Sequence, residues 1–297
     1  VAAALSTSQP AVEALQIIVK ESDVAYVEYE RRLGANAPPG LYSVSVRARF
    51  MAARSLRGAR FGDAQRLHGG TFIVDALFSG RDLVSDATFL IDICLAEELL
   101  QKAVAPLHQC TIDDHATLSA CGRRNATGGA IAQALWSAVS AGLPAQSGIE
   151  RLKVRVSEHD EAIAEYVRDL HVPRGMHTLV ARGRCMIAHS FRGEEFGPAQ
   201  ALHGCTYVID GRFHAADLAP DDGFVCERAA AERALREAIG LYHQRNLDEL
   251  AEFAAENTTC ERVARAVWAR AANALTPAQR RELNALELVV HESDVAW

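Results

Sequence analysis

Several features that would identify a special class of protein are scarce or missing in this chain of 297 residues. No apolar run approaches the roughly 20 residues that span a bilayer, and the first residues lack the basic region of a signal peptide. The seven cysteines form no Cys-x-x-Cys pair and are odd in number, which excludes a disulfide scaffold and favours reduced thiols in a cytoplasm. The net charge of -7 argues against a nucleic-acid-coating surface.

What is present is ordinary globular composition, with 49% hydrophobic and 23% charged residues. The chain also repeats itself. Residues 54–83 align without gaps on 189–218, and 15 of the 30 positions are identical, including Ala-Gln-x-Leu-His-Gly at 64–69 and 199–204. A partial third copy opens the chain, because Glu-Ser-Asp-Val-Ala at 21–25 recurs at 292–296. We therefore predict a partial unit at 1–33, a whole unit at 41–170 and a nearly whole unit at 176–297.

Each unit shows the same order of predicted elements. Residues 42–50 alternate between apolar and polar, as do 152–156, which is typical of half-buried strands. Residues 94–104 and 226–241 carry apolar residues at helical spacing, and a second helix is expected to open at 257–258 with Thr258 and Glu261 as a capping box. The order strand, strand, helix, helix, strand, strand predicts an α+β fold with an antiparallel four-stranded sheet and two helices on one face.

A glutamate ends the third strand of every copy, in phase with its apolar residues: Glu21, Glu158 and Glu292. Because side chains alternate between faces with period two, these carboxylates are predicted on the apolar face, where they need hydrogen-bond donors. A flat ligand with adjacent ring N–H and amino groups would satisfy both oxygens. The alternative is a strand-end glutamate that faces solvent or pairs with arginine.

A second constellation has the spacing of a metal site. His203 and Cys205 lie at i and i+2 on the second strand, and His189 ends the first strand in its buried phase. A hairpin brings the three together, and two imidazoles and a thiolate leave zinc one open position. The alternative is a core cysteine beside hydrogen-bonded histidines. In the first unit the same positions hold Arg54, His68 and Gly70, a set that cannot bind zinc, so we expect one zinc per chain, in the second unit.

His108 and His243 each follow the first helix of their unit and are candidates for a general acid or base, or for helix-end caps. Together with Asp86-x-x-Phe-Leu-Ile-Asp, Tyr242-His243-Gln-Arg-Asn-Leu-Asp and Asn257-Thr-Thr-Cys-Glu261, these patterns resemble the 6-pyruvoyltetrahydropterin synthase and 6-carboxytetrahydropterin synthase family. The His189 and His203-Gly-Cys205 set resembles the family's lone histidine and its His-Gly-His pair.

The resemblance implies the tunnelling fold, in which oligomers of such units close a β-barrel and bind a pterin or purine-like ligand between units. It implies that the third-strand glutamates anchor the pterin, that Thr127 and Thr259 help to bind it, and that zinc acts on dihydroneopterin triphosphate. The family's catalytic cysteine, however, falls on Ala64 and Ala199, and the aspartate before its catalytic histidine falls on Leu107 and Tyr242. Two hypotheses follow, a divergent zinc lyase with one active unit and a non-catalytic pterin- or purine-binding oligomer.

The segment 15–31 has the alternation of a third and a fourth strand without a first or a second. We expect it to pair in the sheet, and we expect a closed homo-oligomer built through sheet edges.

Overall fold

The computed structural model describes residues 13–22, 24–34, 36–84, 86–119, 125–160, 162–220 and 222–292. The chain divides into two compact units, of which unit 1 comprises 1–158 and 165–176, and unit 2 comprises 159–164 and 177–297. Cys121 and the fourth strand expected towards Trp297 lie outside the described residues. No helix in the described part of the chain is long and apolar enough to cross a membrane.

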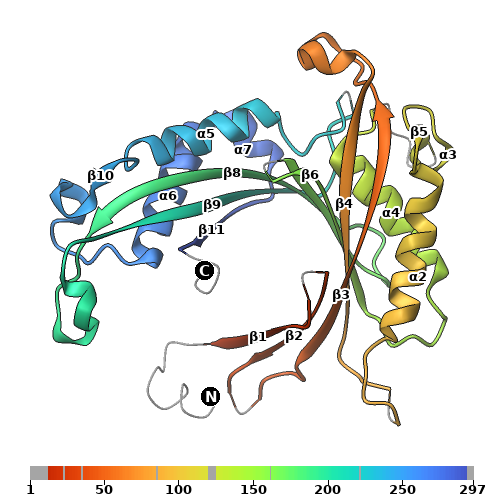
Figure 1. Cartoon of the computed structure of the whole chain (residues 1–297), viewed down its shortest axis with the longest axis horizontal. Helices are drawn as coiled ribbons and strands as arrows, with labels where there is room; N and C mark the ends of the chain where they lie inside the picture. Colours follow the sequence, from red (N-terminus) through yellow and green to blue (C-terminus); the bar gives the residue numbers. More distant parts are fainter. Residues whose placement is uncertain are drawn as a thin grey trace. The chain divides into compact units, whose positions relative to one another are not determined.

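Unit 1 is built on a long antiparallel hairpin of β3 (Leu41–Arg54) and β4 (His68–Gly80), to which β6 (Arg151–His159) adds next to β4. The strand order is β1-β2-β3-β4-β6-β7, with β7 at Ala162–Asp169, of which residues 165–169 belong to unit 1. Helices α2 (Ile93–Val104) and α4 (Gly128–Gly142) cover one face of this sheet (Figure 1). Alternate residues of the strands are fully buried beneath them, and each large apolar side chain there contributes about 1.5–3 kcal/mol.

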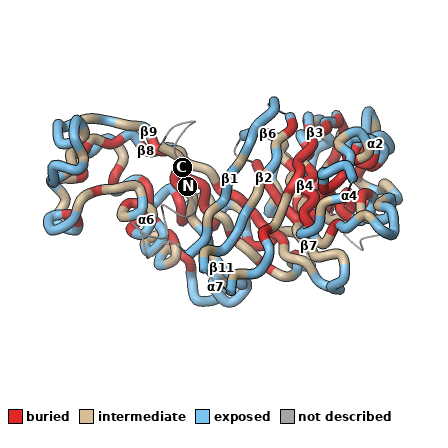
Figure 2. The backbone as a smooth tube through the Cα atoms, turned by 90° about the horizontal axis from the view of Figure 1, so that it is seen from below, coloured by how far each residue is buried: buried red, intermediate tan, exposed pale blue. Residues whose placement is uncertain are grey.

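The predicted pairing of the first segment is confirmed. β1 (Ala14–Lys20) pairs with β2 (Ala25–Arg32), and β2 pairs with β3 in antiparallel register. Among the described residues the chain forms no helix before β3, and Figure 2 shows much of β1 as exposed. Ile17 and Val19 are exposed, whereas their counterparts Val154 and Val156 in β6 are buried. The hairpin therefore supplies strand pairing to unit 1 but little core.

Unit 2 repeats the plan with β8 (Met176–His189) and β9 (His203–Ala215), and β11 (Ala285–His291) pairs with β9. Helices α5 (Arg228–Gly240) and α6 (Cys260–Ala274) lie along one face of these strands (Figure 1). Trp268 in α6 donates its indole N–H to the Leu286 carbonyl at 2.8 Å, and Trp136 in α4 does the same to Leu152 in unit 1. The repeated tryptophan thus ties the second helix to the third strand in both units.

The sequence did not indicate several short elements. They are η1 (Ala59–Gln65), η2 (Ala105–Leu107), β5 (Cys110–Thr111), α3 (Ala116–Ser119), η3 (Glu194–Gln200), β10 (Arg245–Asn246), η4 (Leu247–Glu249), η5 (Ala251–Phe253) and α7 (Pro277–Glu282).

The predicted capping box at Thr258 and Glu261 is wrong. The N-cap of α6 is Thr259, and its side chain makes no cap hydrogen bond. The Thr258 hydroxyl is instead engaged by His189 and Asp248, so contacts across the unit override the local capping pattern.

Candidate metal and ligand site

The site in unit 2 begins with His189, the last residue of β8, whose side chain is completely buried. Its Nδ1 lies 3.0 Å from the Thr258 carbonyl oxygen, which can only accept, so Nδ1 carries the proton. Nε2 therefore presents a lone pair, and it has no hydrogen-bond partner among the described residues. Burial lowers the pKa of this imidazole, which keeps it neutral and able to bind a metal.

Cys205 approaches the same space from β9. It pairs with Ile187, two residues before His189, so the thiol lies diagonally across the hairpin from the imidazole. The Tyr207 hydroxyl bonds the Cys205 thiol, and burial raises the pKa of both groups. Without a metal, this cysteine is therefore a thiol at neutral pH.

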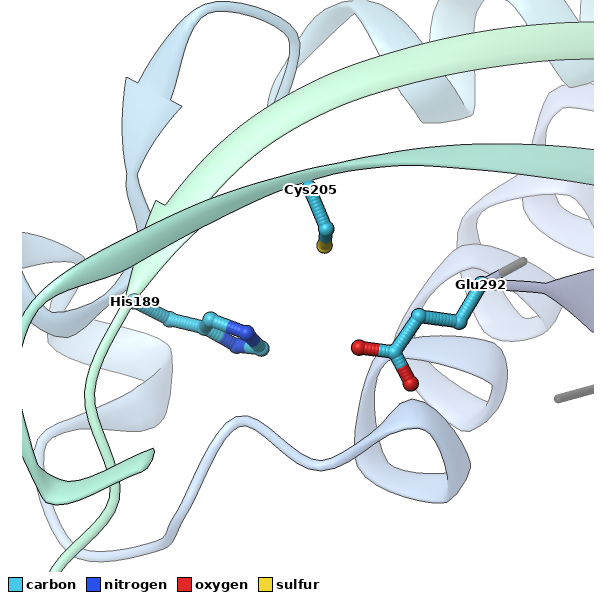
Figure 3. Close-up of side chains that lie close together, drawn as sticks. All are labelled: His189, Cys205 and Glu292. Atoms are coloured by element: carbon cyan, nitrogen blue, oxygen red, sulfur yellow. The ribbon is translucent and has the colours of Figure 1, made fainter. Parts of the chain in front are cut away.

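Glu292 completes a cluster from the residue that follows β11. The ligand atoms of His189, Cys205 and Glu292 all lie within 4.8 Å of one another, and Figure 3 shows the three side chains pointing toward a common centre. An unpaired buried imidazole nitrogen, a thiol and a carboxylate form a donor set that suits zinc. The chemistry of the residues thus fits the metal that the sequence led us to expect.

His203, the third predicted ligand, lies beside this cluster. Its ring centroid is 4.5 Å from that of His189, with which it pairs across the hairpin. Its Nδ1 lies 2.8 Å from the Ala201 carbonyl oxygen, so Nδ1 carries the proton and Nε2 has the lone pair.

A shell of hydrogen bonds fixes the imidazole of His189. The Thr258 hydroxyl contacts both His189 Nδ1 and Asp248, at 3.2 and 3.5 Å. Asn257 bonds the backbone N–H and carbonyl of Arg192, both at 2.8 Å, and so clamps the chain after β8 to the start of α6. Second-shell partners of this kind set the tautomer and orientation of a ligand histidine.

In unit 1, different residues occupy the positions that correspond to this cluster. Arg54 replaces His189, and its guanidinium donates to the Ala126 carbonyl and to Glu158, both at 2.5 Å. It also lies over the ring of Phe72, 5.1 Å from the centroid. Gly70 replaces Cys205, and a Cβ at Gly70 would come within 2.9 Å of the Glu158 carboxylate. The arginine thus supplies a fixed positive charge where unit 2 has the cluster of His189, Cys205 and Glu292.

The two predicted acid–base histidines, His108 and His243, accept equivalent backbone hydrogen bonds in the two units. Nδ1 of His108 accepts the backbone N–H of Met51 at 3.2 Å, and Nδ1 of His243 accepts that of Met186 at 3.3 Å. The neutral ring therefore carries its proton on Nε2, which presents a donor and not a base. Tyr242, in the place of the family's aspartate, is buried and its hydroxyl accepts from Arg270.

The remaining predicted residues occupy varied places. Thr127 is buried as the N-cap of α4 and accepts from the Ala130 N–H at 3.3 Å, whereas Thr259 is a half-buried N-cap of α6. Glu21 is exposed in the turn after β1, so it does not share the environment of Glu292.

Sequence reasoning overlooked one residue at the site. Cys260, the first residue of α6, donates its thiol to Glu292 at 3.3 Å and lies 3.8 Å from the Tyr207 hydroxyl. The sequence shows Cys260 within the run Asn-Thr-Thr-Cys-Glu. Whether its side chain faces the strands depends on the residue at which α6 begins, and the sequence pattern does not fix that residue.

Comparison with known proteins identifies a family whose sequence profile matches this chain. The sequence profile of 6-pyruvoyl tetrahydropterin synthase matches the chain twice, at residues 43–169 and 178–297. A search of the curated proteins found no match.

Solved structures of this description resemble part of the chain. 6-pyruvoyl tetrahydropterin synthase from Caenorhabditis elegans is 12% identical with a TM-score of 0.38, covering 43% of this chain and 96% of its own. The Plasmodium falciparum synthase is 14% identical with a TM-score of 0.36, covering 43% and 98%.

Proposed function

The chain belongs to the 6-pyruvoyl tetrahydropterin synthase family, as two tandem units, and on that premise we propose that unit 2 is a divergent zinc lyase. Its substrate is a dihydropterin such as dihydroneopterin triphosphate. The observation that carries the proposal is the buried, unpaired Nε2 of His189, which faces Cys205 and Glu292. A completely buried imidazole lone pair without a partner is costly unless a ligand or a metal fills the space.

In this proposal the zinc is held by His189 and Cys205, with His203 as the third ligand that the resemblance implies. Bound zinc polarises an oxygen of the ligand and stabilises the charge that develops there. Glu292 accepts the adjacent ring N–H and amino groups of the pterin, which orients the side chain of the substrate toward the metal. His243 presents its Nε2 proton as an acid or hydrogen-bond donor.

Unit 1 has no such activity in this proposal. Its third-strand carboxylate, Glu158, is already occupied by Arg54, and the guanidinium fills the place of the metal. We therefore expect one metal and one pterin per chain.

The chain lacks two groups that catalysis would need, and this favours a second function, that of a non-catalytic binding protein. No thiol stands at position 199, and the His243 tautomer presents no basic nitrogen to a ligand. A non-catalytic oligomer that binds a pterin or a purine-like ring through Glu292 would need neither group.

Zinc analysis and a ligand titration test the proposal. Protein purified without chelators should hold one zinc per chain, and Glu292→Gln should lose most of its affinity for neopterin. Glu158→Gln is the matched control in unit 1 and should bind neopterin like the wild type. Zinc-free protein, or equal affinities of wild type and Glu292→Gln, would refute the proposal. Turnover of dihydroneopterin triphosphate, in the same preparations, separates the lyase from the binding protein.

We also propose that the protein is a cytoplasmic homo-oligomer that closes a β-barrel through its sheet edges. All six described cysteines are free, which suits a reducing compartment. Removal of residues 1–33 would uncover the edge of β3 that β2 now pairs. Light scattering should then show a changed particle size, and an unchanged size and melting temperature would contradict the role of this segment.

A further inference from the structure

A cavity of about 570 Å³ lies in unit 1 at the C-terminal end of α4. Its walls come from the last turn of α4, from the loop that leads to β6, and from the end of β7 with the residues that follow it. Glu150, which lines the cavity, precedes β6, whereas Glu158 lies near the end of the same strand. The cavity and the Arg54–Glu158 pair are therefore separated by most of the length of β6.

Arg168 in β7 lines this cavity together with Trp136 of α4. Its guanidinium carbon lies 3.7 Å from the centroid of the indole ring, which is a cation–π contact. Trp136 is itself held in place, because its N–H donates to the Leu152 carbonyl at 2.8 Å and its ring makes an edge contact with Tyr166. The stack therefore gives the guanidinium plane a defined orientation.

The guanidinium of Arg168 has no counter-ion and no hydrogen-bond acceptor within the described part of the chain. Its Nε is buried without a partner, so the group is partly removed from water. The nearby carboxylates already have cations of their own, because Glu150 pairs with Arg81, and Asp169 pairs with Arg151 at 2.5 Å. A partly desolvated cation without an anion is unfavourable, which favours binding of an anion from outside the chain.

The cavity beside this arginine is held open by backbone hydrogen bonds. The Glu150 N–H donates to the Ser79 carbonyl at 2.8 Å, and the Leu170 N–H donates to the Glu150 carbonyl at 2.7 Å. Leu143, Pro144 and Leu170 add apolar surface to the walls. The volume lies within the range of small-molecule sites, roughly 300–1,000 Å³.

The contact between helix and strand does not explain the arginine. In unit 2, Trp268 donates its indole N–H to the Leu286 carbonyl at the same 2.8 Å, although 42% of this tryptophan is exposed. An indole that ties the second helix to the third strand therefore needs no cover. Stacking also occupies only the face of a guanidinium and leaves its N–H donors unused.

We infer that this cavity binds a small organic acid with one carboxylate and an apolar body. The carboxylate accepts parallel N–H bonds from the Arg168 guanidinium, and the apolar body packs against Leu143, Pro144 and Leu170. Asp82 also lines the cavity and is exposed, so it repels a second negative charge on the ligand. A monocarboxylate is therefore favoured over a phosphate dianion, and this site is independent of the proposed chemistry in unit 2.

Titration of the full chain with isovalerate, a branched monocarboxylate, tests the inference. Trp268→Phe and Trp297→Phe leave Trp136 as the sole tryptophan, so its fluorescence reports binding at the ring beneath Arg168, while calorimetry gives the affinity. We expect saturable binding that changes this fluorescence. Isovalerate should bind more tightly than acetate, which lacks the apolar body, and more tightly than inorganic phosphate.

Substitutions in the same background locate the site, and circular dichroism verifies that each variant is folded. Arg168→Gln should weaken isovalerate binding by about 10-fold or more, because a charged donor pair is lost. Arg168→Lys keeps the charge without the planar fork and should weaken binding less. Asp82→Asn should strengthen it by about 2- to 5-fold, because an exposed like charge is removed. Arg174→Gln, which removes an exposed arginine outside the cavity, should bind like the unsubstituted chain.

Three results would overturn the inference. They are a wild-type background without saturable isovalerate binding, equal affinities of that background and both Arg168 variants, and tighter binding of phosphate than of isovalerate. Each of them leaves zinc and pterin binding by unit 2 untouched, since those are measured on other residues. A weaker affinity in Arg174→Gln equal to that in Arg168→Gln would also overturn it, because net charge alone would then account for the binding.

Discussion

The ion pair between Arg54 and Glu158 gives the sharpest stability prediction. The Arg54 side chain is 8% exposed and the Glu158 side chain is 24% exposed. The guanidinium is therefore almost fully desolvated, whereas the carboxylate remains partly solvated. Arg54→Met removes the donor of the Ala126 carbonyl, which is buried, and leaves Glu158 without its cation. An orphaned buried acceptor costs about 1–3 kcal/mol, and breaking a buried pair costs about 3–5 kcal/mol.

Because Glu158 retains solvent, we expect the lower end of that range, about 3 kcal/mol for Arg54→Met. Glu158→Gln keeps a neutral acceptor for the guanidinium and should cost about 1 kcal/mol. The double variant no longer contains an uncompensated carboxylate, so it should be less destabilised than the sum of the two, by about 1–2 kcal/mol.

The assay must isolate unit 1, since a chain of two units need not unfold in one step. Trp136 is the sole tryptophan of unit 1 in the sequence, so Trp268→Phe and Trp297→Phe leave its fluorescence as a local probe. Urea unfolding in this background gives the free energies of the cycle. A cost below about 1 kcal/mol for Arg54→Met, or strict additivity of the two changes, would show that the guanidinium is not the centre of this site.

Three further predictions concern the metal and the chemistry. Arg54→His with Gly70→Cys should raise the zinc content by one per chain, because loss of the guanidinium frees the carboxylate that crowds position 70; unchanged stoichiometry by mass spectrometry would contradict this. Metal affinity should fall as pH falls from about 8 to 6, because burial raises the pKa of the Cys205 thiol, which must lose a proton to bind; a competition titration that shows no pH dependence would exclude a thiolate ligand. Ala199→Cys should raise the low turnover of dihydroneopterin triphosphate by about 10²-fold or more, whereas Ala64→Cys in unit 1 should not, and equal effects in a kinetic assay would refute the assignment of the active unit.

The fold was largely accessible from the sequence because its signals are local and repeated. Alternation over 42–50 predicted β3, and the 54–83 repeat predicted that β8 and β9 copy the β3–β4 hairpin, as the registers confirm. Strand period alone placed His189 and Cys205 on one face, and the hairpin brings them together. Alternation over 15–31 also predicted that this segment pairs in the sheet, but it did not identify β3 as the partner of β2.

The site was less accessible because it depends on where one helix begins. A shift of one residue at the start of α6 decides whether Thr258, Thr259 or Cys260 faces the strands, and no local propensity fixes that shift. The capping pattern favoured Thr258, but the buried His189 and Asp248 compete for its hydroxyl and prevail. Histidine tautomers are likewise determined by backbone partners from other elements, as Met186 shows for His243.

On the proposed function, the retained glutamate explains how unit 1 keeps the fold of unit 2 without a metal. A carboxylate in a half-buried position needs a positive partner, and in unit 1 the partner of Glu158 is Arg54. Arg54 satisfies that carboxylate and the Ala126 carbonyl at once, from the position that corresponds to His189 in unit 2. A guanidinium is larger than an imidazole, and glycine at position 70 leaves room for the carboxylate that it holds. Arg54 and Gly70 therefore act together, because the arginine supplies a fixed cation and the glycine leaves room for the carboxylate that it holds. That account requires any metal-binding counterpart to change these positions together.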